Sequence, residues 1–505
     1  MSRLRRNIVY NLAGQLTLVL LSFVSARYIY RDLGQDVLGI IYFVMMLNNV
    51  VAGVLELGLG ATVIKEVAAH IETDEPYARR VVRVGAFYFW CAFLLVAGAQ
   101  ALAAPWIVSE WLQVETLPHE DATAIVRVLG PAAFLAFPKT FYTSVFRGMQ
   151  RMGITNVIDV GTTAVQQVGV VGLIASGASL QWVVLWIAMS YVLRVTIYMT
   201  CLGRALSWGT LIPGYDAEVV SRNATFVRQV AGMSLLGLVQ SQGDKLVMSK
   251  LLPVSVVGWY GFAYGTTGKG TQVSSSVATA VFPRLSELAH ADDKAGLSKA
   301  FHGVQTLMRF GLLPVFMGIP FVVPFVFSNV LDVTAMEALW LPTSLLALGF
   351  YMQGTMMVPH FLALGMERAD IVFRQVLFAL FLVFPLTVWL IHDFGLIGAP
   401  LGWLAYQVWA YAYGARHIYA QCLGLAPKQF YLEVAVSLTL GAVAYAPPFL
   451  ALSLTVGFDL HWAMLGYLSG LGLYVAGFWL VAGPEARAEI KDVLSRLRSR
   501  RKQAS

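Results

Sequence analysis

Charged residues interrupt the apolar stretches of this 505-residue chain, and one such segment runs from Gln240 to Gln272 near its middle. Asp244, Lys245, Lys250 and Lys269 all fall in this segment. A buried carboxylate can bind H⁺ or Na⁺, and an ammonium group can bind a phosphate. An ionisable residue inside a bilayer is costly and usually faces a cavity, a partner or a pathway. The segment therefore predicts a polar lumen between helices, which suits transport.

Lys269 is the first candidate for binding substrate. It follows four polar or small residues in the string GTTGKGT, roughly 20 Å along its helix at about 1.5 Å per residue. The string resembles a phosphate-binding P-loop, but Gly270 stands where that loop needs Ser or Thr. An ATPase is therefore excluded. A lysine in so polar a span can meet a pyrophosphate, or it can snorkel to the cytoplasmic surface.

Asp244 and Lys245 lie about 12 Å from the outer end of their helix at 1.5 Å per residue. Neighbours in a helix point about 100° apart, so the two need not pair with each other. Asp244 is a candidate for coupling to H⁺ or Na⁺, and Lys245 for binding a substrate anion. An interhelical ion pair, or a lysine that reaches the outer interface, is the alternative.

Further cations complete the predicted cationic lumen: Arg309, Lys139 and Arg27. Each of them either lines the lumen or snorkels to an interface. Glu56 is the second ion-coupling candidate, with a structural ion pair as its alternative. The remaining ionisable residues of the spans lie nearer to helix ends and receive no role: Asp159, Arg194 and His360. No catalytic residue, metal site or cofactor is expected.

The composition defines the class of protein. The chain is 58% hydrophobic and 12% charged, whereas soluble domains average about 25% charged residues. We therefore expect an all-α polytopic membrane protein. The cysteines have neither paired nor metal-type spacing and are interpreted as core hydrophobes: Cys91, Cys201 and Cys422.

Runs of about 20 apolar residues mark membrane spans. About fourteen are predicted, near 7–30, 37–64, 82–107, 123–146, 154–178, 181–203, 225–251, 254–283, 302–328, 337–364, 370–392, 396–420, 431–455 and 461–482. Lys and Arg concentrate in alternate connectors, which places both termini in the cytoplasm. The net charge of +7 is thus a topology signal, and no nucleic-acid partner is expected.

Short segments of the first half resemble segments located about 220 residues later in the sequence. VLGIIY at 37–42 resembles VVGWYG at 256–261, and GMQR at 148–151 resembles GMER at 365–368. Six spans per copy imply a parallel repeat, with sites between the halves. The expected domains are a lobe at 1–203, a cytoplasmic connector at 204–223, a second lobe at 224–424, two additional helices at 425–483, and a basic cytoplasmic tail at 484–505.

These segments carry a family resemblance. LELGLGATVIKE at 55–66, the Asp244-Lys245 pair and FPRLS at 282–286 are similar to the polysaccharide-flippase branch of the multidrug/oligosaccharidyl-lipid/polysaccharide exporter superfamily. The resemblance covers roughly residues 5–420. It implies two six-helix lobes around a central cationic cavity, and export of a lipid-linked oligosaccharide by alternating access.

Alternative functions are a multidrug exporter and a peptidoglycan-precursor flippase of the same superfamily, or a membrane glycan ligase or polymerase. The deep charges are mainly positive, which disfavours cationic drugs. The expected partners are the lipid-linked oligosaccharide, membrane lipids, and a polysaccharide polymerase or glycosyltransferases of the same pathway. We expect a monomer in the bacterial inner membrane.

Overall fold

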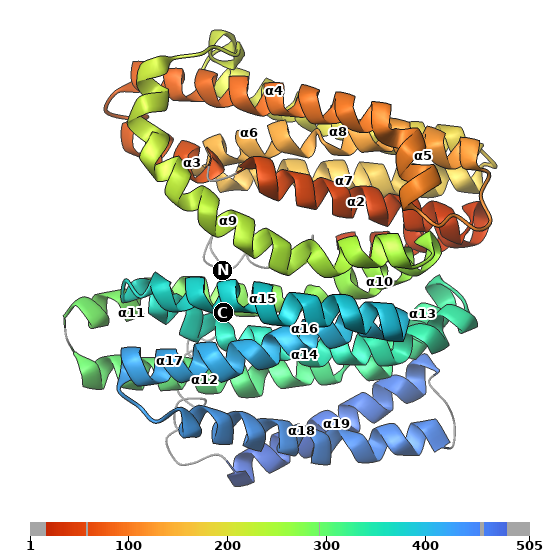
Figure 1. The fold of residues 1–505 in the computed structure, drawn as a ribbon. Coiled ribbons are helices and arrows are strands. Elements are labelled where there is room, and N and C mark those ends of the chain that lie inside the picture. The colour runs from red at the N-terminus through yellow and green to blue at the C-terminus, as the bar shows by residue number, and fades with distance from the viewer. Residues whose placement is uncertain (1–16, 57–58, 292, 455–458, 482–505) are drawn as a thin grey trace, which may run out of the picture. The chain divides into compact units, whose positions relative to one another are not determined.

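The computed structural model describes residues 17–56, 59–291, 293–454 and 459–481, and these residues are predominantly helical (Figure 1). The single β-bridge among them joins Gln113 and Pro253. Ten segments are long and apolar enough to cross a membrane. The expectation of an all-α polytopic membrane protein is confirmed, whereas the count of fourteen spans stays a prediction.

Contacts divide the chain into two compact units, Met1–Gly258 and Trp259–Ser505. This division falls near the middle of the sequence, as expected for two halves. The finer boundaries at 203, 223, 424 and 483 stay predictions.

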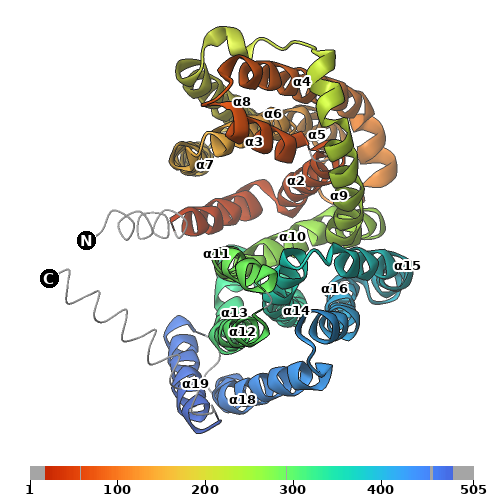
Figure 2. The same cartoon turned by 90° about the vertical axis from the view of Figure 1, so that its left-hand side faces the viewer.

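The first unit is a bundle of long helices (Figure 2). Buried aromatic side chains form much of its core. Its main elements are the π-helical turn η1 (Ile29–Leu33), α2 (Gln35–Glu56), α3 (Leu59–His70), α4 (Glu75–Trp106), α5 (His119–Ala133), α6 (Ala136–Gly148), α7 (Met152–Ala175), α8 (Leu180–Ala205) and α9 (Ala217–Leu251). On α6, Phe137, Phe141 and Phe146 are almost fully buried. Their burial fixes α6 between α3, α4 and α8.

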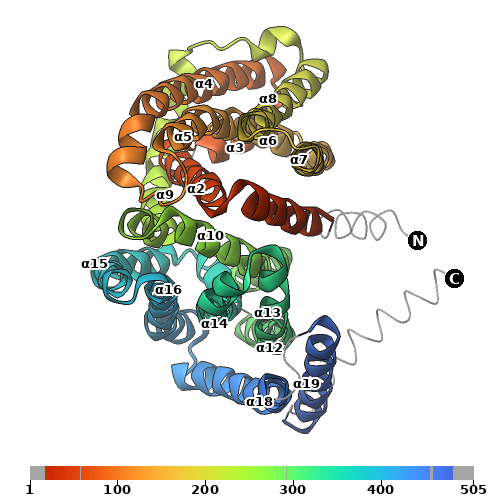
Figure 3. The ribbon, with the colours of Figure 1, turned by 90° about the vertical axis from the view of Figure 1, so that its right-hand side faces the viewer.

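The second unit continues from α10 (Val254–Gly268), which begins in the first unit (Figure 3). It contains α11 (Thr271–His290), α12 (Lys294–Met317), α13 (Ile319–Val330), α14 (Val333–Gly365), α15 (Ala369–Phe394), α16 (Gly398–Trp409), α17 (Arg416–Ile418), α18 (Pro427–Leu454) and α19 (Leu460–Val481). The two additional helices, α18 and α19, pack against each other and against α12 and α13. They therefore belong to the packing of the second unit.

Several predicted spans are pairs of shorter helices. The span near 123–146 breaks between α5 and α6, the span near 254–283 breaks at Lys269–Gly270, and the span near 302–328 breaks at Gly318. Prolines and glycines flank these breaks and weaken the continuous hydrogen-bond ladder. Such breaks are tolerated in a membrane where protein or a cavity surrounds the freed backbone.

The predicted repeat is visible in the backbone after α6 and after α14. Gln150 and Glu367 are the only described non-glycine residues with positive φ, at 57° and 59°. The residue that follows each donates its N–H to the carbonyl oxygen five positions earlier, at 2.9 and 2.8 Å. Each α-helix thus ends in the same Schellman motif, with a side chain where glycine is usual. The shared strain supports a common origin of GMQR and GMER.

The two copies of a second repeated motif, at 37–42 and 256–261, lie in contact with each other. A β-carbon on Gly39 would lie 2.1 Å from the carbonyl oxygen of Val254, and one on Gly258 would lie 2.7 Å from the α-carbon of Gly39. Both glycines belong to the first unit. Only glycine lets α2 and the first turns of α10 approach so closely.

Candidate functional site

A polar cavity of about 310 Å³ lies inside the first unit. Residues of α2, α6 and α8 line it, together with Leu135 at the break before α6. The polar lining consists of amide, hydroxyl and cationic side chains: Asn48, Asn49, Lys139, Thr140, Tyr191 and Arg194. Among these lining residues there is no carboxylate.

Arg194 is held by neutral oxygen atoms of α7. Its Nε donates to Thr162 Oγ1 at 2.9 Å, and its Nη2 donates to Thr163 Oγ1 at 3.1 Å and to Gln166 Oε1 at 3.4 Å. No ion pair involves Arg194 in the described part of the chain. Arginine is permanently charged and presents a planar fork that suits phosphate. The cavity therefore holds a fixed guanidinium whose charge has no compensating carboxylate.

Lys139 supplies the second positive charge. Its Nζ lies 3.0 Å from Asp159 Oδ2 on α7, and the two side chains remain 25% and 37% exposed. The ring of Tyr198 lies beneath the ammonium group, with 5.9 Å from Nζ to the ring centroid. An ion pair this exposed is worth only about 0–1 kcal/mol. An incoming anion can therefore compete with Asp159 for the lysine.

Two carbonyl-type oxygens near these cations lack hydrogen-bond donors among the described residues. They are Asn48 Oδ1 and Asp159 Oδ1, and both are buried. A buried acceptor without a donor costs about 1–3 kcal/mol. Of the two residues, only Asn48 lines the cavity. A ligand that carries a hydroxyl group could donate to Asn48 Oδ1 while its acidic group binds Arg194 and Lys139. The cavity thus suits an anionic, hydroxylated ligand.

Lys139, which the sequence analysis proposed as a lumen residue, lines the cavity, and its role in substrate binding stays a prediction. The placement of Arg194 near a helix end was wrong, because it is the fifteenth of the 26 residues of α8, about 21 Å along at 1.5 Å per residue. Asn48 and Asn49, adjacent amides within an apolar run, were the signal that sequence reasoning missed.

Asp244 and Lys245 on α9 do pair with each other, at 3.1 Å, although neighbours on a helix need not. Lys245 Nζ also donates to the carbonyl oxygen of Ser241 at 2.7 Å, and both charged side chains are nearly buried. This pair forms within one helix, whereas the alternative expected from the sequence was an interhelical pair. Their roles in ion coupling and substrate binding stay predictions.

Arg309 on α12 pairs with Glu433 on α18, and 3.0 Å separates Nη1 from Oε2. The guanidinium is 6% exposed and the carboxylate 22%. Buried tyrosines pack around them, and the hydroxyl of Tyr351 donates to the carbonyl oxygen of Arg309 at 3.2 Å. The sequence interpretation had named Arg309 without this partner. Glu433, a carboxylate at the start of an apolar span, was the available signal.

The remaining predicted site residues lie elsewhere. Lys269 is exposed at the break between α10 and α11 in the second unit, and Arg27 is half-buried in the helical segment before η1. Glu56 ends α2, and its side chain lies outside the described residues. Their roles stay predictions.

Comparisons with known proteins assign this chain to a family. The family model described as "Polysaccharide biosynthesis protein" matches residues 4–289, more than half of the chain. A Shigella flexneri protein named "Putative O-antigen transporter" is 20% identical over 408 residues, which cover 79% of this chain and 93% of the relative.

Solved structures show the same fold. The lipid II flippase MurJ in an inward closed conformation has a TM-score of 0.69 at 12% identity, covering 93% of this chain and 97% of that one. An inward-facing MATE-family multidrug resistance transporter of the MOP superfamily has a TM-score of 0.67 at 14% identity, covering 80% and 95%. The length of the family match decides the assignment: this chain belongs to the polysaccharide biosynthesis protein family.

Proposed function

We propose that the protein is a flippase that moves a lipid-linked oligosaccharide from the cytoplasmic to the outer leaflet for surface polysaccharide synthesis. The observation that carries the proposal is Arg194, a guanidinium in a polar cavity of a membrane helix bundle, held only by neutral oxygens. Such a charge needs an anionic partner during the transport cycle. The phosphate that joins a polyprenyl lipid to its sugars is such a partner.

The cavity also offers a hydrogen-bond acceptor for the sugars of the substrate. Sugar hydroxyls can donate to Asn48 Oδ1, which has no donor among the described residues. The S. flexneri relative supports this substrate class through its printed name. A ligase or polymerase is disfavoured, since the named relatives are transporters and a flippase.

The mechanism that follows is alternating access. The headgroup binds in the cationic cavity while the polyprenyl chain stays in the lipid, because unpaired charge cannot cross hydrocarbon. An inside-negative potential favours outward movement of an anion by about 2.3 kcal/mol per charge per 100 mV. Coupling to H⁺ or Na⁺ through Asp244 or Glu56 is therefore an optional addition.

The test is a headgroup-protection assay in proteoliposomes with a fluorescent polyprenyl-pyrophosphate-linked oligosaccharide. Arg194→Gln removes a hydrogen bond to a charged group, so we expect the flipping rate to fall about 10- to 100-fold. Lys139→Gln should lower the rate by less, because Asp159 already shares this charge.

Arg284→Gln is the matched control, because Arg284 is an exposed arginine that pairs with Glu287. An Arg194→Gln variant that elutes normally and flips at the wild-type rate would refute the role of the cavity. A wild type that ignores this lipid but accumulates cationic dyes would replace the proposal with multidrug export.

A further inference from the structure

A second cavity of the first unit, of about 350 Å³, lies between α3, α4 and α9 and shares no lining residue with the cationic cavity. Its walls are almost entirely apolar, with Val63, Val81, Val84, Phe89 and Val220 among them. A cavity of this kind accepts hydrocarbon rather than water, since water needs two to four polar partners.

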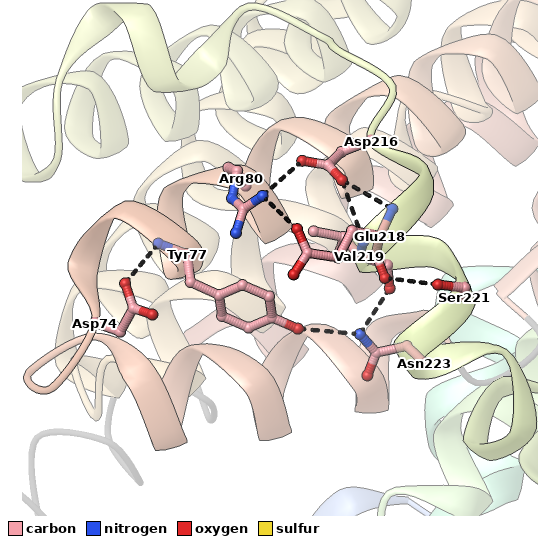
Figure 4. Close-up of polar contacts among 8 residues, drawn as sticks. All are labelled: Asp74, Tyr77, Arg80, Asp216, Glu218, Val219, Ser221 and Asn223. Carbon is pink, nitrogen blue, oxygen red and sulfur yellow. Dashed lines mark hydrogen bonds and ion pairs between the residues drawn. The ribbon is translucent and has the colours of Figure 1, made fainter.

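The polar groups beside this cavity are already engaged. Asn223 Nδ2 donates to the carbonyl oxygen of Val219 at 3.0 Å and lies 3.5 Å from the hydroxyl of Tyr77 (Figure 4). That hydroxyl in turn donates to Glu66 Oε2 at 3.1 Å. Thr62 also has a partner. These groups leave little for water to bind, so the cavity favours an apolar occupant.

The bilayer is the nearest source of such an occupant. α4 is a candidate membrane span, and its Leu94, Leu95 and Leu102 are 65%, 71% and 85% exposed. Some residues that line the cavity are themselves partly exposed, including Leu59 and Ala224. A hydrocarbon chain can therefore enter sideways between α3 and α9.

The helices α4 and α9, which line this cavity, also carry arginines near their cavity-lining residues in sequence. Arg80 is neutralised by Asp216 Oδ2 and Glu218 Oε2, at 3.3 and 2.9 Å (Figure 4). Arg83 and Arg222 are exposed and form no ion pair in the part of the chain that the structure describes.

The contacts of these two arginines are with uncharged groups. Arg83 donates to the carbonyl oxygen of Ile212 at 3.3 Å, and the guanidinium carbon of Arg222 lies 4.7 Å from the centroid of the Tyr77 ring. At about 100° per residue, Arg83 projects from the face of α4 opposite to the lining residues Val81 and Tyr88, so Arg222 is the cation of this site. An uncompensated guanidinium group near an apolar cavity suits a molecule with an anionic head and a hydrocarbon tail. The charge pattern predicts that the side of the protein that carries these arginines is cytoplasmic.

We propose that this cavity binds an acyl chain of an anionic phospholipid of the cytoplasmic leaflet, with the lipid phosphate on Arg222. The proposal concerns a bilayer phospholipid rather than the transported lipid, because the cationic cavity that fits the transported headgroup is a separate one. The inserted chain contacts α3, α4 and α9 together. Bound lipid therefore holds α9 in its place against α3 and α4.

The test uses the full-length protein in a neutral detergent and phosphatidylglycerol with a diazirine at the end of one acyl chain. After photolysis, mass spectrometry locates the labelled peptides. We expect saturable labelling of peptides from α3, α4 and α9. Phosphatidylcholine with the same chains should label them about tenfold less at equal concentration, because its net charge is zero and charge-assisted bonds are lost.

Two kinds of variant test separately the binding of the acyl chain and of the lipid phosphate. Ala224→Leu fills the cavity with a larger side chain and should abolish most of the labelling, and Ala224→Val is a milder version if Ala224→Leu fails to fold. Arg222→Gln should raise the half-saturating lipid concentration about tenfold. Arg79→Gln is the control, since Arg79 lies on α4, which also lines the cavity, but is already paired with Glu75 at 2.7 Å.

Three results would overturn the proposal. The first is labelling confined to the outer leucines of α4, and the second is equal labelling by the two phospholipids. The third is displacement of phosphatidylglycerol by a polyprenyl phosphate at much lower concentration, which would assign the cavity to the transported lipid instead. None of these readouts depends on flipping activity.

Discussion

The two halves of the molecule keep one backbone feature and differ in their interior charges. Gln150 and Glu367 adopt the same left-handed conformation in the same helix-ending turn. In the first unit, however, Lys139 and Arg194 line an open polar cavity. In the second unit, Arg309 is covered by α18 and neutralised by Glu433. A deep cation is thus available to a ligand in one half and tied into packing in the other.

The difference between Arg194 and Arg309 shows what determines the role of a cation in a membrane helix. Whether the cation can bind a ligand depends first on whether a carboxylate already neutralises it. Glu433 lies on one of the two additional helices, so the helices that extend the second unit also neutralise its arginine. Arg194 has only neutral acceptors, which leave its charge free for a ligand.

The largest expected effect comes from breaking the buried pair of the second half. Glu433→Ala leaves Arg309 charged without a partner and should lower the free energy of unfolding by about 3–5 kcal/mol. The melting temperature in detergent is the measurement. The double variant Arg309→Met/Glu433→Leu should recover most of the loss, and Glu287→Ala, at an exposed ion pair, should have almost no effect. Equal melting temperatures for all the variants would contradict the comparison.

In the first half, the shape of the cation should matter as well as its charge. Arg194→Lys keeps the positive charge but cannot donate to Thr162, Thr163 and Gln166 in the same fork geometry. We expect about a tenfold loss of flipping rate with little change in melting temperature. A lysine variant as active as the wild type would show that transport depends on the positive charge alone and not on the hydrogen-bond geometry of arginine.

A smaller effect should follow when Lys139 is released from its partner. Asp159→Asn removes an ion pair worth about 0–1 kcal/mol, so the apparent affinity for the anionic substrate should rise about two- to fivefold. Titration of the fluorescent lipid in the protection assay measures it. An unchanged affinity would place Lys139 outside the binding site.

The smallest effects test the shared turn. Gln150→Gly and Glu367→Gly relieve the left-handed strain, which exceeds the entropic cost of glycine by a small margin, so each should stabilise the protein by about 0.5 kcal/mol. Gln150→Ala keeps the β-carbon and should give no such gain. Melting temperatures that rise in one half only would show that the two turns are not equivalent.

Much of this architecture was predictable from the sequence. Apolar runs indicated a polytopic helical protein, and GMQR and GMER indicated a repeat whose turns coincide in detail. The breaks inside spans were harder to predict, because hydropathy reports length and not the continuity of hydrogen bonds. The site could be predicted least well, and the roles of its residues stay predictions. The sequence analysis proposed Lys139 as a lumen residue but gave Arg194 no role, because the helices that surround a side chain depend on packing between elements far apart in the sequence.

The contact between Gly39 and Gly258 bears on the history of the fold. The two glycines hold the same place in two copies of one motif, and each is the other's neighbour. In a symmetric dimer, a residue that touches its own copy lies on the two-fold axis. A Gly–Gly contact is therefore the trace expected from an ancestral six-helix homodimer whose gene was duplicated and fused. Selection could then change nearly every other position in one half alone, but a side chain at Gly258 would still collide with Gly39, and one at Gly39 would collide with the backbone of Val254.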